Sequence, residues 1–384
     1  MMGILEKRCF ESVSRRLVRA VVIAFLFFLY CEVIHYCVVL LQCTWPSLPV
    51  SSSPRGHSKG QLKVMFIADT HLLGFRKGHW FDKLRREWQM KQAFQTSMVI
   101  HKPDVVFVLG DLLDEGKWCD DDEFNYHVSR FKSMFAVPQG TELHVVSGNH
   151  DEGFHYMITD HKHLRFERSF DSPSVRMLRI KNNIFVLVNS MAMEGDHCTL
   201  CTAAEDQLQK IATKLAQLRN CGKRSSSDDS CSEFQGIQYT KPVLLQHFPM
   251  YRQSDSVCNT EDSAPPEEKN IPFRLRYDCL DQRSSNQLFS LLQPRLVVSA
   301  HTHHGCYLVH PNGVPEWSVA SFSWRNRNNP TLLLARIDSN HHVVSQCFMP
   351  KESTIMNIYI LGGIVSFLSL FWPSSGLGRR KKFW

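Results

Sequence analysis

The chain has 384 residues and a formal net charge of +7, and 43% of its residues are hydrophobic and 21% charged. This length and balance exclude an intrinsically disordered chain and predict one large globular domain with attachments. The positive charge is concentrated at the two termini, so it bears on membrane topology and gives no reason to expect a nucleic-acid partner.

An apolar run near the N-terminus predicts a membrane-spanning helix over residues 17–41, after a short basic tail, 1–16. The run is longer than the core of a signal peptide, and the following "LQCTWPSLP" is a poor cleavage site. We therefore expect a signal anchor rather than a cleaved signal. Glu32 and His35 interrupt the run one helical turn apart, and we expect them to face another helix or to snorkel.

A Pro/Ser/Gly-rich linker, 42–61, precedes a segment, 62–349, in which short apolar runs alternate with helical patterns. The runs predict strands buried on both faces, and the alternation predicts a layered α/β fold. The expected strands are 62–68, 104–110, 143–148, 184–189, 242–247, 295–300, 317–321 and 331–337. The expected helices are 81–101, 121–135, 203–220 and 284–292.

After a linker, 350–354, a second apolar run over 355–372 has about the minimum length for a membrane span. Basic residues flank the outer ends of both runs, so the positive-inside rule predicts two cytosolic termini and a lumenal domain. In the final tail, 373–384, Lys381 and Lys382 stand fourth and third from the end. This resembles the dilysine retrieval signal of endoplasmic reticulum membrane proteins, which the COPI coat reads; the alternative is a basic tail that only sets topology.

Nine cysteines lie between the end of the N-terminal linker and the second run, and a lumenal location would permit disulfides. The closely spaced pairs Cys221/Cys231 and Cys258/Cys279 are the bridges that we predict, although spacing does not fix connectivity. The odd count leaves at least one thiol free. The "CTLC" of residues 198–201 lacks a second CxxC, which argues against a zinc knuckle.

Two polar segments interrupt the alternation of strands and helices. The first, 221–240, is Ser-rich and reads as a surface loop. The second, 251–283, is a long polar loop that begins just after His247. Long loops in compact domains are either functional or disordered. We expect the second loop to lie near whatever site His247 belongs to.

Polar side chains follow most of the expected strands. They are Asp69, His71, Asp111, Asn149, His150, His247, His301 and His303. Strand ends pool such side chains into one crevice of an α/β sheet. Oxygen and imidazole donors without thiolate suit Mn, Fe or Zn at a hydrolytic centre, and one carboxylate, Asp111, could bridge two ions. Each motif alone is weak, but the ordered set predicts a two-metal site.

The series "DTH", "GDLLDEG", "GNHDEG", "QHFP" and "AHTHHG" resembles the calcineurin-like metallophosphoesterases, over about residues 63–336. The resemblance implies a four-layer α-β-β-α sandwich of two mixed β-sheets and metal-dependent hydrolysis of phosphoric esters. One departure is Ala300, where the family usually has Gly. We expect the ligands to survive this small change.

The same resemblance implies roles for the motif residues. One divalent ion would be held by Asp69, His71, Asp111 and His303. The other would be held by Asp111, Asn149, His247 and His301. His150 would protonate the leaving oxygen, with Asp151 orienting its imidazole.

Two spans and a dilysine end narrow the resemblance to the endoplasmic reticulum metallophosphoesterases that remodel glycosylphosphatidylinositol (GPI) anchors. This implies removal of ethanolamine phosphate from a mannose, expected to be the second, with Mn²⁺ as the expected metal and Zn²⁺ or Fe as alternatives. It also implies GPI-anchored proteins as substrates and their cargo receptors as candidate partners. The implied location is endoplasmic reticulum exit sites, the intermediate compartment and the cis-Golgi.

Candidate substrate contacts are His304, Trp324 and Arg325, because Arg suits phosphate and Trp can stack on a sugar. A solvated loop without substrate contacts is at least as good an interpretation of this region. Two other functions stay open: hydrolysis of a different lumenal phosphoester, such as a phospholipid head group, or a non-enzymatic cargo adaptor on a retired hydrolase fold. The intact set of ligands favours an enzyme.

Overall fold

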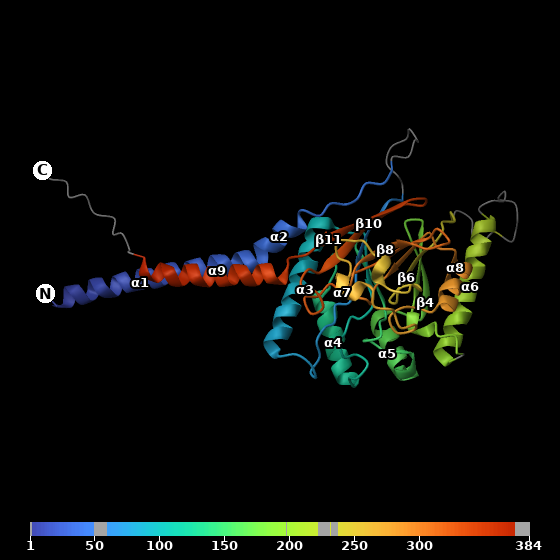
Figure 1. Ribbon diagram of the computed structural model, residues 1–384, viewed down its shortest axis with the longest axis horizontal. Coiled ribbons are helices and arrows are strands. Elements are labelled where there is room, and N and C mark those ends of the chain that lie inside the picture. Colours follow the sequence, from blue (N-terminus) through green and yellow to red (C-terminus); the bar gives the residue numbers. More distant parts are fainter. Residues whose placement is uncertain (1, 50–59, 197, 222–230, 232–236, 373–384) are drawn as a thin grey trace. The chain divides into compact units, whose positions relative to one another are not determined.

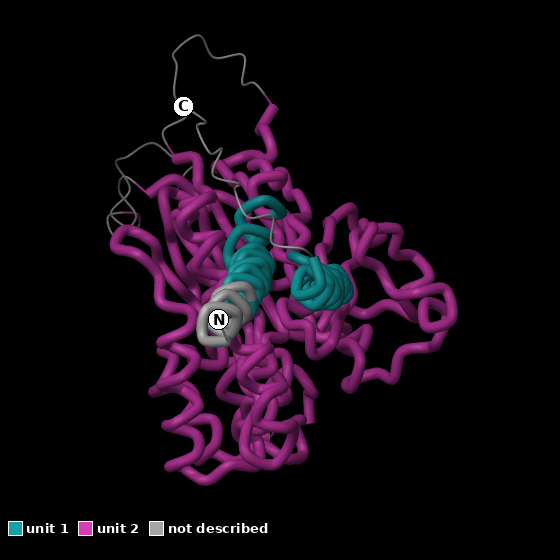
Figure 2. Tube along the Cα trace, turned by 90° about the vertical axis from the view of Figure 1, so that its left-hand side faces the viewer, with its two compact units in different colours: residues 1–39, 350–384 teal, residues 40–349 magenta. Residues whose placement is uncertain are grey.

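The computed structural model describes residues 2–49, 60–196, 198–221, 231 and 237–372, and the chain divides into two compact units (Figures 1 and 2). The helical unit comprises residues 1–39 and 350–384, and the globular unit comprises residues 40–349. The predicted dilysine signal, Lys381 and Lys382, lies outside the described residues.

The helical unit contains two helices that are long and apolar enough to cross a membrane, Val13–Leu40 and Glu352–Phe371. The first runs through α1 (Met2–Leu29), a π-helical turn (Tyr30–Ile34) and α2 (His35–Leu40); the second is α9. These two helices are compatible with a two-pass membrane protein.

The two apolar helices contact each other through polar groups. The Glu32 carboxylate contacts the hydroxyl of Tyr359, and the Arg19 guanidinium donates to the carbonyl oxygen of Trp372 at 2.8 Å. A Cβ at Gly362 would lie 2.6 Å from the ring of Phe27, so a side chain there would force the helices apart. Glu32 therefore faces another helix, which is one of the two placements expected from the sequence.

The globular unit contains two mixed sheets. The first has the order β11-β10-β1-β2-β3, and the second has the order β4-β5-β6-β7-β9-β8. The strands of the first are β1 (Leu62–Ile67), β2 (Val105–Leu109), β3 (Glu142–Val146), β10 (Thr331–Ile337) and β11 (His342–Phe348). Those of the second are β4 (Val175–Ile180), β5 (Asn183–Val188), β6 (Val243–Gln246), β7 (Leu296–Ser299), β8 (Cys306–Val309) and β9 (Pro315–Ser318).

All eight predicted strands form, and β4, β8 and β11 are additional. These three stand at sheet edges, where several side chains meet solvent; β4 and β11 therefore contain polar residues, and β8 is apolar but only four residues long. The pairing is parallel along β1, β2 and β3 of the first sheet and along β5, β6, β7 and β9 of the second, which brings their carboxyl ends to one edge of each sheet.

The sheets pack face to face around buried side chains such as Phe66, Phe107, Phe185 and Val298. Helices α6 (Thr199–Cys221) and α8 (Gln282–Leu292) bury apolar residues against the outer face of the second sheet. The remaining layer contains α3 (Trp80–His101) and α4 (Asp121–Met134), joined where Gln95 donates to the Met134 carbonyl at 3.0 Å. The predicted four-layer sandwich is confirmed (Figure 1).

All four predicted helices form, and the one-turn α7 (Pro266–Lys269) and the longer α5 (Asp160–Phe170) are additional. The α5 sequence "DHKHLRFERSF" is mostly polar, and Phe166 is its one fully buried side chain among the described residues. With so few apolar residues, such a segment gives little signal by which a helix could be predicted.

Four disulfides join described cysteines: Cys43–Cys347, Cys198–Cys201, Cys221–Cys231 and Cys258–Cys306. The predicted Cys221/Cys231 bridge is confirmed. The predicted Cys258/Cys279 bridge is wrong, because the start of β8 brings the Cα of Cys306 within 4.8 Å of that of Cys258. Cys279 is a buried free thiol that donates to the carbonyl of Arg252.

Because Cys258 and Cys306 act as one cross-link, Cys258→Ser and Cys306→Ser should each lower the free energy of unfolding by about 2–4 kcal/mol, and the double substitution should cost no more than either single one. Denaturant titration of the full chain in detergent measures this. Cys279→Ala is the matched control and should change stability much less. A larger loss from Cys279→Ala than from Cys306→Ser would contradict the connectivity.

Candidate metal centre

The polar cluster predicted from the sequence assembles where strands from both sheets end. Asp69 and His71 follow β1, Asp111 follows β2, and Asn149 and His150 follow β3. From the second sheet, His247 follows β6, and His301 and His303 follow β7. Five of these eight residues are buried, and His150, His301 and His303 reach solvent in part.

The backbone at this cluster is strained. Five of its residues have left-handed φ angles: Asp69 (52°), His71 (44°), Asp111 (50°), His301 (75°) and His303 (61°). Side chains other than Gly rarely adopt this conformation, and such strain concentrates at functional sites. A Cβ at Gly148 would lie 2.2 Å from the backbone nitrogen of Asp111, so only glycine lets the loops after β2 and β3 approach this closely.

Four side chains form the first group of donors: Asp69, His71, Asp111 and His303, whose ligand atoms lie within 4.8 Å of one another. The Nε2 atoms of His71 and His303 are 3.0 Å apart. His71 Nε2 is 3.5 Å from Asp111 Oδ2, and His303 Nε2 is 3.7 Å from Asp69 Oδ1. This is the set that the family resemblance assigned to one ion.

The second group shares Asp111 and adds His247 and His301. His247 Nε2 lies 3.4 Å from Asp111 Oδ1, 3.2 Å from Asn149 Oδ1 and 3.2 Å from His301 Nδ1. Asp111 thus presents one oxygen to each group, as a bridging carboxylate would.

The donors fit two divalent cations. Asp69 Oδ1 is buried and has no hydrogen-bond partner among the described residues. Burial, together with the neighbouring Asp111 carboxylate, raises the pKa of Asp69 to about 8. A nearby positive charge, such as a metal ion, would therefore be needed to keep Asp69 ionised at neutral pH. Oxygen and imidazole donors suit a hydrolytic metal pair, and the arrangement supports two divalent ions without fixing which metal they are.

His150 stands beside the two donor groups and faces the open side of the site. Its backbone N–H donates to Asp111 Oδ1 at 2.7 Å, and its Nδ1 lies 2.9 Å from the carbonyl oxygen of Asp114. Burial lowers the pKa of His150, but the Asp111 and Asp114 carboxylates outweigh it and raise that pKa above its ordinary value. A protonated imidazole is the state that a general acid requires.

The expected contact between Asp151 and the His150 imidazole is wrong. The Asp151 carboxylate accepts hydrogen bonds from the backbone N–H groups of Leu113, Gly148 and Leu112, at 2.9, 2.9 and 3.3 Å. Asp151 therefore ties the loop after β2 to the loop after β3 and positions the backbone of both. Burial raises its pKa to about 7, against the effect of these donors.

Asp114 has the orienting contacts that were expected of Asp151. Its Oδ1 lies 3.2 Å from His71 Nδ1 and 3.4 Å from His150 Nδ1, and its Oδ2 lies 3.1 Å from the Arg325 guanidinium. Burial alone would raise the pKa of Asp114, but hydrogen bonds from His150 and His71 hold it well below its usual range. The "GDLLDEG" motif contained this residue, but nothing in its spacing distinguished it from a turn former.

The donor groups open into a cavity of about 780 Å³. One wall comes from the loop 251–283, including Glu268, Arg274 and Tyr277, and confirms that this loop lies beside His247 and the site. Lys117 and Phe154, which sequence reasoning missed, also line the cavity, and the ring of Phe154 stacks on that of Tyr277. The Tyr277 carbonyl oxygen lies 2.7 Å from His301 Nε2, so this wall contacts a proposed ligand directly.

The three candidate substrate-binding residues have different surroundings in the structure. His304 lines the cavity, where it contacts Arg327 and Glu268. Trp324 was expected to stack on a sugar, but it is only 5% exposed and lies under the Arg85 guanidinium rather than in the cavity wall. Arg325 forms an ion pair with Asp114, the same carboxylate that lies beside the His150 imidazole.

A sandwich of two mixed sheets with carboxylate, amide and imidazole donors at its strand ends defines a metal-dependent phosphoesterase. The chain belongs to the calcineurin-like phosphoesterase family, whose family model matches residues 62–305, and it is a phosphoric-ester hydrolase.

Known proteins agree with this assignment. The chain is 46% identical over 349 residues to "Metallophosphoesterase 1" of Xenopus laevis, covering 88% of this chain and 85% of that protein. It is 46% identical over 339 residues to the protein of the same name from Gallus gallus, covering 87% and 84%. A solved dimetal phosphatase from Danio rerio aligns over 76% of this chain and 99% of its own at 12% identity and a TM-score of 0.45.

Asp111→Asn should lower the bound metal below two ions per chain and reduce phosphodiester hydrolysis by about a thousandfold, because a neutral amide cannot bridge two cations. Elemental analysis of the purified chain and steady-state hydrolysis of a chromogenic phosphodiester measure the two effects. Asp104→Asn, at the opposite end of β2, is the matched control and should retain both ions. Full metal content in Asp111→Asn would exclude a bridging role.

Asp114→Asn should reduce kcat about 10- to 100-fold and leave KM and the bound metal nearly unchanged, because it weakens the contacts that position His150. Steady-state kinetics with metal analysis measures this. Asp121→Asn, an exposed carboxylate on α4, serves as the control. A rise in KM at constant kcat would show that Asp114 does not act through His150, and loss of metal would show that its contact with His71 matters more.

Proposed function

We propose that this chain is a metal-dependent phosphodiesterase that removes ethanolamine phosphate from a mannose, expected to be the second, of GPI anchors. The proposal rests mainly on one observation: the two groups of metal donors open into a cavity of about 780 Å³, in a chain that also has two candidate membrane spans. A cavity of this size accommodates a phosphodiester together with part of a sugar. Similarity to proteins named metallophosphoesterase 1 supports the chemistry.

The cavity wall offers groups that match the parts of such a substrate. Lys117 reaches the cavity beside the metal donors and suits a phosphate oxygen, and Phe154 and Tyr277 stack on each other at 4.4 Å to give an apolar surface for a sugar. The Glu268 carboxylate suits the ammonium group of ethanolamine.

Hydrolysis divides between the metal ions and the protein. Two bound divalent ions, for which we propose Mn²⁺, would polarise the phosphoryl oxygen and lower the pKa of a water molecule. Asp69, Asp111, Asn149 and the histidines would hold them. His150 would donate a proton to the leaving sugar oxygen, and Asp114 holds its imidazole in place from the other side.

We further propose that the globular unit is lumenal, that both termini are cytosolic, and that the chain cycles between endoplasmic reticulum exit sites, the intermediate compartment and the cis-Golgi. The dilysine residues, Lys381 and Lys382, would be read by the COPI coat. GPI-anchored proteins would be the substrates, and their cargo receptors are candidate partners. Removal of the side branch would support export of GPI-anchored proteins.

The test is hydrolysis by the purified full chain, loaded with Mn²⁺, of GPI that carries ethanolamine phosphate on its second mannose. Release of ethanolamine phosphate is expected from wild type and not from Asp111→Asn, with much slower turnover of phosphatidylethanolamine. In cells that lack this protein, GPI glycans should retain the branch when analysed by mass spectrometry. Preferred turnover of phosphatidylethanolamine, or an unchanged glycan in those cells, would overturn the substrate.

A further inference from the structure

We propose that the outer face of α3 lies in the interfacial layer of the same membrane that the two apolar helices cross, and so docks the globular unit on the bilayer. The surface in question, here called the α3 stripe, comprises Trp80, Phe81, Leu84, Trp88 and Val99. The inference depends on the candidate spans crossing a bilayer and is independent of the substrate proposed above.

Helix α3 is apolar on two opposite sides. Its inner side buries Met90, Ala93 and Phe94 against the rest of the globular unit, as a surface helix normally does. On the other side, Trp80 is 67% and Val99 71% exposed, and the intervening stripe residues are exposed as well. A soluble surface helix carries polar residues on that side.

The stripe is dense over the N-terminal half of the helix. Trp80, Leu84 and Trp88 follow one another at intervals of four residues, and Val99 lies three turns beyond Trp88 on the same side, after an interval that contains Lys91 and Gln95. Contiguous exposed apolar surface of this kind marks an interaction site, whereas single exposed apolar residues do not.

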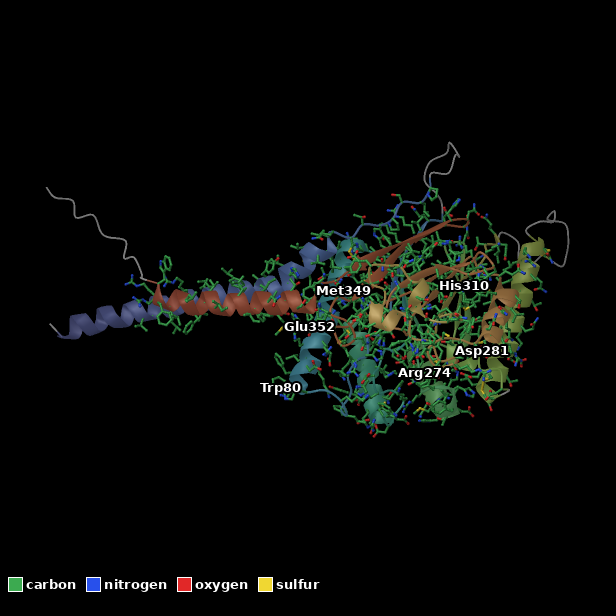
Figure 3. All side chains as sticks on the ribbon, viewed as in Figure 1. Trp80, Arg274, Asp281, His310, Met349 and Glu352 are labelled. Atoms are coloured by element: carbon green, nitrogen blue, oxygen red, sulfur yellow. A yellow bond between two sulfur atoms is a disulfide. The ribbon has the colours of Figure 1, made fainter. Side chains whose placement is uncertain are left out.

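Chain connectivity brings one end of the stripe to the membrane. The first candidate span ends at Leu40, and Trp45 follows five residues later, at most about 18 Å away in a fully extended chain. The Trp45 indole N–H donates to the carbonyl oxygen of His101 at 3.0 Å, so the C-terminal end of α3, next to Val99, is fixed to this short segment. Figure 3 shows Trp80 on the same side of the globular unit as Met349, where the chain leaves for the second apolar helix.

The chemistry of the stripe matches the interfacial layer rather than a protein core. Trp prefers the boundary between head groups and acyl chains, and helices that lie in this boundary combine Trp, Phe and Leu with Lys and Arg. Lys77, Lys83 and Lys91 lie on or beside α3 and are exposed in whole or in part. A groove of about 430 Å³ between α3 and α4, lined by Leu84, Trp88 and Tyr126, would admit apolar groups of lipids at the same depth.

A lipid bilayer is therefore the occupant that these observations favour. A second copy of the chain would also cover apolar surface, but the cationic residues beside the stripe would then face one another, whereas anionic head groups neutralise them. Docking at α3 in addition to two spans would fix the orientation of the globular unit, and with it that of the cavity, toward substrates in the same leaflet.

The test uses the full chain in nanodiscs whose phosphatidylcholine carries bromine near the interfacial end of its acyl chains, because bromine quenches indoles at its own depth. The chain has 8 tryptophans, so the emission of Trp80 and Trp88 is obtained as the difference between wild type and the Trp80→Ser/Trp88→Ser variant. Trp80 is 67% and Trp88 41% exposed, so neither belongs to the core and the variant should fold. We expect this difference emission to fall at least about threefold in brominated nanodiscs relative to unbrominated ones.

Val309→Ser removes an equally exposed apolar side chain from β8 and should leave the quenching unchanged. Equal difference emission in brominated and unbrominated nanodiscs would overturn the proposal. So would a change from dimer to monomer on Trp80→Ser/Trp88→Ser without bromine quenching, since a second copy would then cover the stripe. If wild type shows bromine quenching but does not hydrolyse GPI, the proposed substrate is overturned and the membrane docking stands.

Discussion

The burial of several carboxylates at one end of the sandwich is the constraint on which the rest of the structure depends. Asp69 and Asp111 lie side by side with little access to water, and buried like charges are costly unless cations or donors compensate them. Two divalent cations held by the neighbouring donors would compensate these two, while Asp151 is compensated by three backbone N–H groups. Left-handed backbone at five positions and a glycine without room for a Cβ are tolerated because they bring these groups together.

Most of the fold could be predicted from the sequence because its central strands are buried on both faces and read as unbroken apolar runs. Among the parts that escaped prediction, β4, β11 and α5 meet solvent over much of their surface, so their sequences mix polar with apolar residues, and β8 is an apolar run of only four residues. The bridge from Cys258 was mispredicted for a related reason, since Cys306 approaches it only through the position of the edge strand β8.

The proposed metal ligands could be predicted because each follows a strand and parallel strands end together. Their supporting partners could not. Asp114 and Asp151 differ in role through the course of two loops, and loop backbone leaves no periodic trace in a sequence. The position of Trp324 likewise depends on Arg85, a residue of α3 that is distant in the chain, so residue type alone suggested a sugar contact that the fold does not provide.

The disulfide between Cys43 and Cys347 joins the two segments by which the globular unit is connected to the apolar helices, across a sequence separation of 304 residues. It has a mechanical consequence. Tension applied through either apolar helix passes from one segment to the other through this covalent link, so the pairing of β10 with β11 and of β1 with β10 carries little of the load. A force that pulls the two apolar helices apart is therefore borne by the disulfide, and the hydrogen bonds between these strands are spared.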